Sequence, residues 1–516
     1  MKKTFSCLLL LCLLATLVAI PGCQKPTDET PPAKEPASEG LTFELSQNRQ
    51  YYVLTGMGSC RDTKLVIPST HLGLPVRAIA AGAFRTTKSA TLTHSGNALT
   101  LLEQVTDSGA EGEITEVVIP DGITDIGDEA FAGCDKLRDV QISDLVSKIG
   151  TDAFKDTAFY REASNWQNGA LYLEGYLVAV REDLTGTLTV ADGTRQIADG
   201  AASGCGITGV VLPSSLRIIG KRAFASCTAL SRVDLSVAAL TVCEEAFAGC
   251  TALTEAIIGN DEIPTTVPKD DLPTMTTVNG SMGGVLLGPT DSTFYYANAA
   301  VLYIDPTFVF STVVEKRAFA DCTALTTLSF GTNVHYLGAE VFAGCTALKA
   351  VDMSRVTAPA DQTPILHPRG VSYSTMVLSG AFKDCTSLTD IKLPQGLTAL
   401  YETFSGCTAL ADITLPDSLT IIGPAAFRNC TALAAVHVPD AVTHILSDAF
   451  NGLPATAEIS LGHVVVAISE RAFANVPAIH YRGTVTQWSQ VGVSSMVSGV
   501  DGIPVTVHCI DGTTYT

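Results

Sequence analysis

The chain has 516 residues, of which 46% are hydrophobic and only 16% are charged. This composition provides ample apolar surface for a buried core and excludes a largely disordered chain. The formal net charge is −20 at pH 7, and the Lys and Arg residues do not cluster. Binding to nucleic acid requires clustered positive charge, so no nucleic-acid partner is expected.

Residues 1–22 are predicted to be a lipoprotein signal peptide. Two lysines precede an apolar run that ends at Ile20 and is short for a membrane-spanning helix. The segment IPGC (20–23) resembles a bacterial lipobox, which makes Cys23 the expected lipidated residue. An ordinary signal peptide cleaved nearby is the alternative. We expect membrane attachment only through this N-terminal lipid, at the outer membrane or cell surface of a bacterium, with a Gram-negative cell favoured.

Residues 23–40 are predicted to form a disordered tether. The segment QKPTDETPPAKEPASEG (24–40) is rich in Pro, Glu, Thr and Lys, and it has no apolar residue larger than proline. Such a segment buries too little surface to fold, and its prolines stiffen it. We expect it to hold the folded part of the chain away from the lipid anchor.

A repeat of 23 residues dominates the remaining sequence. From Phe404 to Phe473 one phenylalanine recurs every 23 residues, and a degenerate copy has Ala202 at this position. Periods of about 20–29 residues with leucines at fixed offsets are typical of leucine-rich repeat solenoids. The clearest copies of the repeat are AFAGCTAL (246–253), VFAGCTAL (341–348), TFSGCTAL (403–410) and AFRNCTAL (426–433).

The segment CTALADITLPDSLTIIGPAAF (407–427) shows how one coil is built. Leu410, Ile413 and Leu415 follow the LxxLxL spacing, whose last three positions alternate inward and outward as in a strand. Pro416 ends that strand because it has no amide hydrogen to donate to a neighbouring coil. The apolar residues that follow are spaced for a return path facing the same core. We therefore predict a leucine-rich repeat solenoid, a β-rich right-handed coil with a parallel sheet on one face.

The predicted solenoid has terminal caps and insertions. Residues 41–84 are predicted to form the N-terminal cap and first repeat, 85–478 the solenoid, and 479–516 the C-terminal cap. One insertion is expected to be a hairpin-like excursion of two or three strands. Insertions in repeat proteins map to loops on one side, often the binding side. They lie at about 85–113, 158–196, 261–303 and 354–379.

The pattern AFxxCTxLxxVxLPxxLxxIGxxAF, present in whole or part at 130–154, 223–247 and 381–473, resembles the BspA-like leucine-rich repeat family of bacterial surface proteins. The opening YYVLTGMGSCRDTKLVIPSTHLGLPV and the closing YRGTVTQW and TVHCIDG are also similar to the ends of that family. The resemblance implies a solenoid at the cell surface. It also implies adhesion to host matrix proteins, other bacteria or surfaces.

Nine cysteines recur at one phase of the repeat. Stacked coils lie about 4.8 Å apart, so the thiols should form a line, whereas zinc requires a tetrahedron of ligands. Neighbouring α-carbons fall within disulfide range, but parallel side chains are poorly oriented to bond. Because Thr157, Leu453 and Val476 occupy the same phase, we predict free, buried thiols that fill space. The nine are Cys134, Cys205, Cys227, Cys250, Cys322, Cys345, Cys385, Cys407 and Cys430, and the state of Cys60, Cys243 and Cys509, which lie off this phase, stays open.

The sequence lacks the motifs of catalytic and cofactor sites. It contains no HExxH, no P-loop, no GxGxxG after a predicted strand and no calcium-binding DxDxDG loop. The segment NGSMG (279–283) has asparagine where a serine elbow requires glycine. The nine histidines are scattered, and a lone histidine is more often a surface or core residue than a catalytic one. We predict a protein that is not an enzyme and that has neither a cofactor nor a metal site.

Function is therefore assigned to the residues that the repeat leaves on the surface. Outward residues of successive strands should lie side by side and form a ribbon, and extended ribbons of solenoids bind ligands. Three aromatic residues in the 261–303 insertion, Phe294, Tyr295 and Tyr296, are alternative anchors. The structural alternatives are a solvated sheet face for the ribbon and burial against the solenoid for the aromatic residues. The ribbon candidates are Thr327, Ser329, Asp390, Lys392, Asp412, Thr414, His437, Glu458 and Ser460.

The expected function is adhesion to a host or bacterial macromolecule, without catalysis. A glycan-binding accessory lipoprotein and a structural surface protein with no specific ligand are the alternatives. The expected partner in the first two cases is a protein or glycan outside the cell.

Overall fold

The computed structural model divides the chain into two compact units, Met1–Pro36 and Ala37–Thr516. The predicted signal peptide, Cys23 and most of the tether lie outside the described residues. All of the described hydrophobic core belongs to the second unit and begins at Leu41. The structure describes residues 35–86, 88–95, 98–105, 110–237, 240–261, 275–276, 285–287, 293–295, 312–356, 364–367, 370–373, 377–493 and 505–515.

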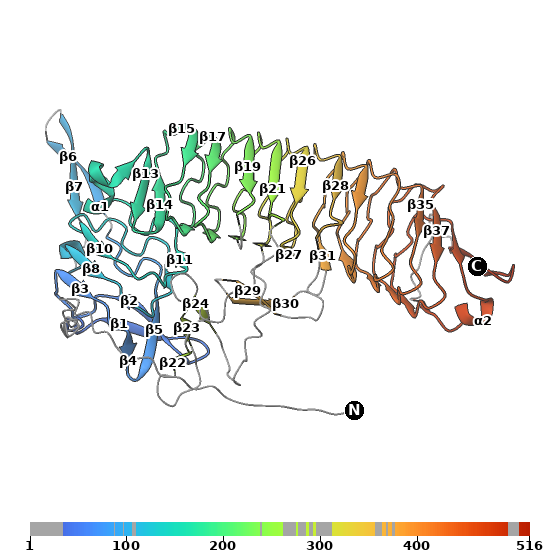
Figure 1. Cartoon of the computed structure of the whole chain (residues 1–516), viewed down its shortest axis with the longest axis horizontal. Helices are drawn as coiled ribbons and strands as arrows, with labels where there is room; N and C mark the ends of the chain where they lie inside the picture. Colours follow the sequence, from blue (N-terminus) through green and yellow to red (C-terminus); the bar gives the residue numbers. More distant parts are fainter. Residues whose placement is uncertain are drawn as a thin grey trace, which may run out of the picture. The chain divides into compact units, whose positions relative to one another are not determined.

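The second unit is a solenoid of stacked coils, which confirms the predicted fold (Figure 1). Each regular coil, apart from the one that contains residues 411–416, contributes a strand from the LxxLxL segment, here called the leucine strand. Leucine strands of neighbouring coils pair in parallel and in register, as Val233 with Ala256 and Leu235 with Ile258. The leucine strands are β3 (Lys64–Val66), β8 (Glu116–Val118), β10 (Asp139–Gln141), β15 (Thr185–Thr189), β17 (Gly206–Val211), β19 (Arg232–Leu235), β21 (Glu255–Ile258), β26 (Thr327–Phe330), β28 (Ala350–Asp352), β32 (Asp390–Lys392), β35 (Ala435–His437), β37 (Glu458–Leu461), β39 (Ala478–Tyr481) and β41 (Thr506–Cys509).

The return path of each coil also forms a short strand, which the sequence pattern did not predict. Ile197 pairs with Ile219, and Ile219 pairs with Val242, so a second parallel ladder runs along the stack. These return strands are β9 (Asp125–Ile126), β11 (Lys148–Ile149), β16 (Gln196–Ile197), β18 (Ile218–Ile219), β20 (Thr241–Val242), β25 (Thr312–Val314), β27 (Val334–Leu337), β31 (Val377–Ser379), β33 (Ala399–Tyr401), β34 (Ile421–Ile422), β36 (His444–Ile445), β38 (Ala467–Ile468) and β40 (Gly492–Val493).

The remaining elements belong to the ends and insertions. At the N-terminal end β1 (Thr42–Leu45), β2 (Tyr52–Gly56), β4 (Thr70–His71) and β5 (Leu74–Ile79) join the sheet that contains β9. The segment before β15 holds α1 (Ala158–Arg161), η2 (Ala163–Asn165) and three antiparallel strands, β12 (Trp166–Gln167), β13 (Ala170–Leu173) and β14 (Tyr176–Val180). The other elements are β6 (Lys88–Ser95), β7 (Ala98–Val105), η1 (Ala110–Glu113), β22 (Met275–Thr276), β23 (Val285–Leu287), β24 (Thr293–Tyr295), β29 (Pro364–His367), β30 (Gly370–Tyr373), α2 (Val485–Trp488) and β42 (Thr514–Tyr515).

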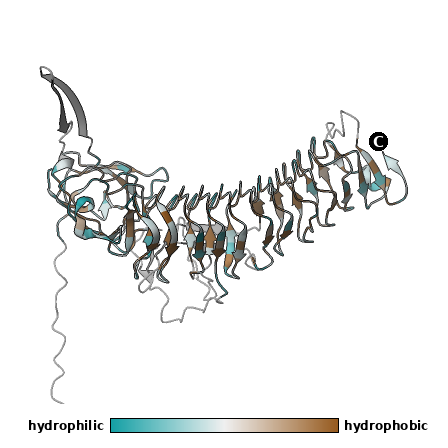
Figure 2. Cartoon of the chain, turned by 90° about the horizontal axis from the view of Figure 1, so that it is seen from above, coloured by the Kyte–Doolittle hydropathy of each residue, from teal (hydrophilic) through white to brown (hydrophobic). Residues whose placement is uncertain are grey.

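A column of stacked phenylalanine rings forms the centre of the core. The rings of neighbouring coils lie 5.0 to 6.0 Å apart between centroids and are nearly parallel. The column runs from Phe84 to Phe154 and again from Phe224 to Phe473, and buried Ala202 occupies the intervening coil, as predicted. Figure 2 shows hydrophobic residues recurring in strand after strand along the stack. Each coil therefore covers the aromatic ring of the coil before it, as stacking in a repeat protein requires.

Left-handed backbone conformations explain which residue precedes the repeat cysteine. Gly249 and Gly406 at this position have φ of +72° and +78°, and Asn429 has φ of 59°. Glycine adopts this region without a steric penalty, and Asn and Asp tolerate it better than other residues. The Gly, Asn and Asp residues before most repeat cysteines therefore reflect one recurring turn, and Ser226 before Cys227 adopts the same conformation with φ of 59°.

The C-terminal end is closed by a short helix and an antiparallel strand. Thr484 and Gln487 form a capping box at the start of α2, and Trp488 at its end packs on Tyr481 with the ring centroids 5.1 Å apart. Strand β42 then pairs antiparallel with β41 and ends the ladder of leucine strands. Within the part of the chain that the structure describes, no helix is long and apolar enough to cross a bilayer.

Candidate binding surface

The outward side chains of the leucine strands form the surface on which the binding prediction depends, and we call it the outward ribbon. In β26 Leu328 is buried between exposed Thr327 and Ser329, and in β32 Ile391 is buried between exposed Asp390 and Lys392. The same alternation leaves Asp412, Thr414, His437 and Glu458 exposed and Ser460 half-buried. Every predicted ribbon residue therefore points away from the core, except that Ser460 is partly covered.

One predicted strand of the ribbon is absent. Asp412 and Thr414 are exposed around buried Ile413, but residues 411–416 do not form a strand. The Asp412 carboxylate accepts the amide hydrogen of Ile413 at 2.9 Å. Local side-chain bonds of this kind compete with a sheet ladder for backbone donors, which accounts for the missing strand.

An ion pair occupies part of the ribbon between β28 and β32. Lys392 Nζ lies 2.8 Å from the Asp352 carboxylate on the neighbouring strand. The hydrogen bond from Lys392 lowers the pKa of Asp352 to about 2 and, in turn, raises the pKa of Lys392. Exposed pairs of this kind contribute little to stability, so Lys392 remains available to a ligand that offers a better partner.

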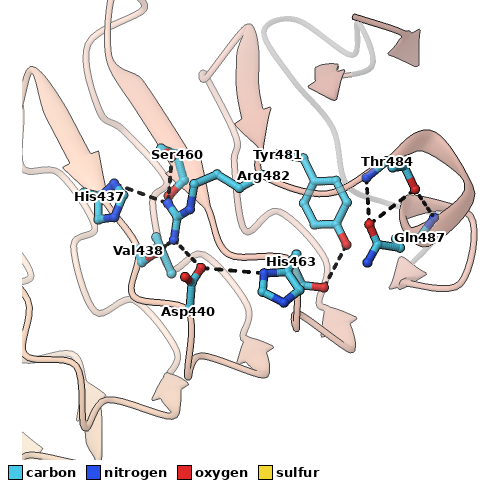
Figure 3. Close-up of polar contacts among 9 residues, drawn as sticks. All are labelled: His437, Val438, Asp440, Ser460, His463, Tyr481, Arg482, Thr484 and Gln487. Atoms are coloured by element: carbon cyan, nitrogen blue, oxygen red, sulfur yellow. Dashed lines mark hydrogen bonds and ion pairs between the residues drawn. The ribbon is translucent and has the colours of Figure 1, made fainter. Parts of the chain in front are cut away.

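Arg482 binds a second part of the ribbon (Figure 3). Its guanidinium donates to Ser460 Oγ at 2.8 Å, lies 3.2 Å from His437 Nδ1, and donates to the Val438 carbonyl at 2.8 Å. It also pairs with Asp440 at 2.7 Å, and this hydrogen bond lowers the pKa of the Asp440 carboxyl. Arg482 follows β39 and reaches back over two coils. His437 and Ser460 are therefore held in an internal network, a role that the sequence pattern did not predict.

The remaining ribbon candidates are uncommitted. In the described part of the chain, the side chains of Thr327, Ser329, Asp390, Thr414 and Glu458 make no hydrogen bond or ion pair. The residues that alternate with them along the chain point inward and are buried in the hydrophobic core. These five side chains can form polar contacts with a ligand without first breaking contacts within the protein.

The outward ribbon also extends to strands β19 and β21, where the sequence pattern predicted no binding residue. Arg232 and Asp234 point outward on β19, and Glu255 does so on β21. Arg232 pairs with Glu255 at 2.9 Å across the two strands. The segment CTALSRVDL (227–235) has the same motif phase as the later coils, so the sequence already carried the signal for these residues.

The predicted aromatic anchors are described only in part. Phe294 and Tyr295 lie in β24, which pairs antiparallel with β23 in a separate three-stranded sheet. The structure does not describe their side chains, and Tyr296 lies outside the described residues. The choice between an exposed anchor and a buried one thus stays a prediction.

The repeat cysteines are buried, as predicted, and they also donate hydrogen bonds. The Cys407 thiol donates to the Phe382 carbonyl at 3.1 Å, and the Cys430 thiol donates to the Phe404 carbonyl at 3.0 Å, each on the preceding coil. Burial raises the pKa of Cys430 to about 12. A thiol with such a pKa is protonated at neutral pH and is a poor nucleophile. The same bond to the preceding coil is made by Cys134, Cys227, Cys250, Cys322, Cys345 and Cys385.

The cysteines off this phase are also buried, and Cys60 and Cys509 are free thiols. The described residues contain no group of three or more His, Cys, Asp or Glu side chains that could hold a metal ion.

The sequence matches the BspA type leucine rich repeat region in six copies, over residues 107–163, 183–267, 291–360 and 372–482. The chain belongs to this family. Membership supports a binding role without catalysis. No curated protein matches the sequence.

Solved structures of bacterial leucine-rich repeat proteins are similar to this chain. A leucine-rich repeat protein from Bacteroides ovatus is 18% identical, with 88% of this chain and 98% of that chain covered and a TM-score of 0.37. A leucine rich cell surface protein from Faecalibacterium prausnitzii is 20% identical, with 89% and 99% covered and a TM-score of 0.33. A leucine-rich repeat protein from Eubacterium ventriosum is 18% identical, with 81% and 94% covered and a TM-score of 0.28.

Proposed function

We propose that the protein is a non-enzymatic adhesin that binds a host or bacterial protein through its outward ribbon. The observation that carries this proposal is the set of exposed side chains on the ribbon that make no internal polar contact. Among them Asp390 and Glu458 are acidic, and Asp412 lies between them along the chain. A partner with basic or hydrogen-bonding groups spaced along an extended surface fits this arrangement.

We further propose that the protein is anchored at the cell surface through a lipid on Cys23. The lipobox-like IPGC segment and the Pro-rich stretch after it support this location. Replacing Cys23 with Ser should release the protein from the membrane fraction and abolish incorporation of labelled fatty acid. Membrane retention of the variant with unchanged labelling would refute lipidation at this residue.

The binding proposal is tested with purified Ala37–Thr516 by surface plasmon resonance against a panel of matrix proteins and by adhesion to bacterial cells. We expect saturable binding to at least one of them. The double variant Asp390→Ala, Glu458→Ala should weaken that binding, because it removes the uncommitted acidic groups of the ribbon.

The matched control is the double variant Asp417→Ala, Glu470→Ala. It removes the same charge from exposed positions outside the outward ribbon. Equal weakening by both double variants would indicate a general charge effect and would refute a ribbon site. Absence of binding across the whole panel would refute adhesion itself.

A glycan-binding accessory lipoprotein remains the second candidate, and it depends on Phe294, Tyr295 and Tyr296. A glycan array separates the two functions. Binding to sugars that disappears when these three aromatic residues are replaced by Ala would favour the glycan-binding function. A structural surface protein would bind neither class of ligand.

A further inference from the structure

Two histidines lie side by side near the C-terminal end of the outward ribbon. His480 on β39 and His508 on β41 are direct partners in the parallel ladder. Both are exposed, and their rings stack with centroids 5.4 Å apart at an interplanar angle of 28°. The sequence pattern did not reveal this pair, because His480 and His508 lie farther apart than one 23-residue period.

The spacing of the pair suits joint coordination of one metal ion. Parallel strands hold neighbouring side chains about 4.8 Å apart, and imidazole nitrogens bind divalent transition metals at about 2.0–2.1 Å. Because the rings are stacked, their in-plane nitrogen lone pairs run roughly parallel, so the two exposed side chains have to rotate to bring a nitrogen from each ring to a common ion. The backbone ladder fixes the separation, so little chain entropy is lost on binding.

The surroundings of His508 favour the same geometry. Thr514 on β42 lies beside it, with the hydroxyl oxygen 3.4 Å from His508 Nδ1. When Nδ1 donates to this hydroxyl, the lone pair of the ring lies on Nε2, which is the nitrogen free to bind a metal. The hydroxyl thus acts as an outer partner that orients the ligand.

Arg482, which directly follows β39, is directed away from the pair. Its guanidinium is held by Val438 and Asp440, on the side opposite β41. At the corresponding place after β41 the chain has Ile510, which is uncharged. The positive charge of Arg482, which would repel a metal cation, therefore lies over the preceding coils and not beside the histidine pair.

We propose that His480 and His508 form a two-imidazole site for a divalent transition metal such as Cu²⁺, Ni²⁺ or Zn²⁺. Water fills the other coordination positions, since the described residues offer no group of three metal-ligating side chains. Of these three ions, Cu²⁺ should bind most tightly. The site does not depend on the proposed adhesion function.

The test uses the intact purified protein without a histidine tag, titrated with NiCl₂ by calorimetry and with CuCl₂ by electron paramagnetic resonance. We expect one Ni²⁺ equivalent that is lost in both His480→Ala and His508→Ala, and Cu²⁺ spectra with nitrogen coupling from two imidazoles. The control His444→Ala removes an exposed strand histidine from β36 and should retain the equivalent.

Circular dichroism checks that each variant is folded, which is expected because both side chains are exposed. The proposal is overturned if either variant binds Ni²⁺ with wild-type stoichiometry and affinity. It is also overturned if the Cu²⁺ spectrum of the wild-type protein shows a single imidazole ligand, since a chelate requires both rings.

Discussion

The phenylalanine column predicts that the same substitution costs more inside the stack than at its end. Phe427 stacks on Phe404 at 5.5 Å and on Phe450 at 5.4 Å, whereas Phe473 stacks, among the residues that the structure describes, on Phe450 alone, at 5.4 Å. Phe427 and Phe473 are both completely buried. Replacement of either by Leu keeps most of the apolar volume but removes the ring contacts.

The magnitude follows from the number of rings that each residue contacts. A stacked aromatic pair contributes about 0.5–1.5 kcal/mol beyond its buried area. Phe427→Leu should therefore lower the free energy of unfolding by about 1–3 kcal/mol, and Phe473→Leu by about half as much. Phe427→Ala adds a cavity and should cost about 3–5 kcal/mol.

Urea unfolding followed by circular dichroism measures these differences, and amide hydrogen exchange locates them. In a stack held by nearest-neighbour contacts, exchange should increase most in the coils on both sides of Phe427. Equal losses for Phe427→Leu and Phe473→Leu, with native circular dichroism in both, would contradict a stabilising role for the column.

Three further predictions concern the turns, the thiols and the C-terminal network. Gly204→Ala should cost about 1–2 kcal/mol, because φ is +74° there and no other heavy atom lies within 4 Å of the added Cβ. Gly204→Asn should cost less, since Asn tolerates this region. Thermal unfolding compares the two variants, and equal losses would contradict the backbone explanation. Burial raises the pKa of Cys385 and Cys430 to about 12 from an ordinary value of 9.0, so their stabilising effect is complete below pH 9.0 and is lost as the pH rises towards 12. Each thiol then loses up to about 1.4 kcal/mol per pH unit. Urea unfolding at pH 8 to 11 measures this loss. In the double variant Cys385→Val, Cys430→Val the free energy of unfolding should fall less steeply with rising pH than in the wild-type protein. An unchanged slope would contradict a stabilising effect of the protonated thiols. Arg482→Lys should lower stability by about 1–3 kcal/mol, because lysine keeps the charge but cannot make the same forked bonds; hydrogen exchange should rise around β35 and β37, and unchanged protection there would show that the network does not stabilise these coils.

The cysteine of the CTAL motif shows both the reach and the limit of sequence reasoning. Its substitution by Leu453 and Val476 at the same phase correctly indicated a buried, space-filling role. The hydrogen bond from the thiol to the preceding coil could not be read from that pattern, since it depends on where the carbonyl of Phe382 or Phe404 lies in space. Leucine and valine fill the volume without replacing that bond.

For the outward ribbon, the sequence predicted which residues are exposed but not which of them are held by contacts within the protein. Strand alternation placed Thr327, Ser329 and Asp390 outward, because alternation is a local property of the backbone. Alternation could not show that Arg482, which lies 45 positions later in the chain, holds His437.

The sequence by itself determined the period, the inward residues and the family, because each coil repeats the same short-range pattern and buries its apolar side on an identical neighbour. Only the tertiary structure decided the second ladder of return strands, the network around Arg482 and the pairing of His480 with His508. These features depend on backbone pairing and on contacts between coils that do not repeat. No periodic pattern encodes such contacts, and they decide which parts of the outward ribbon are left to bind a ligand.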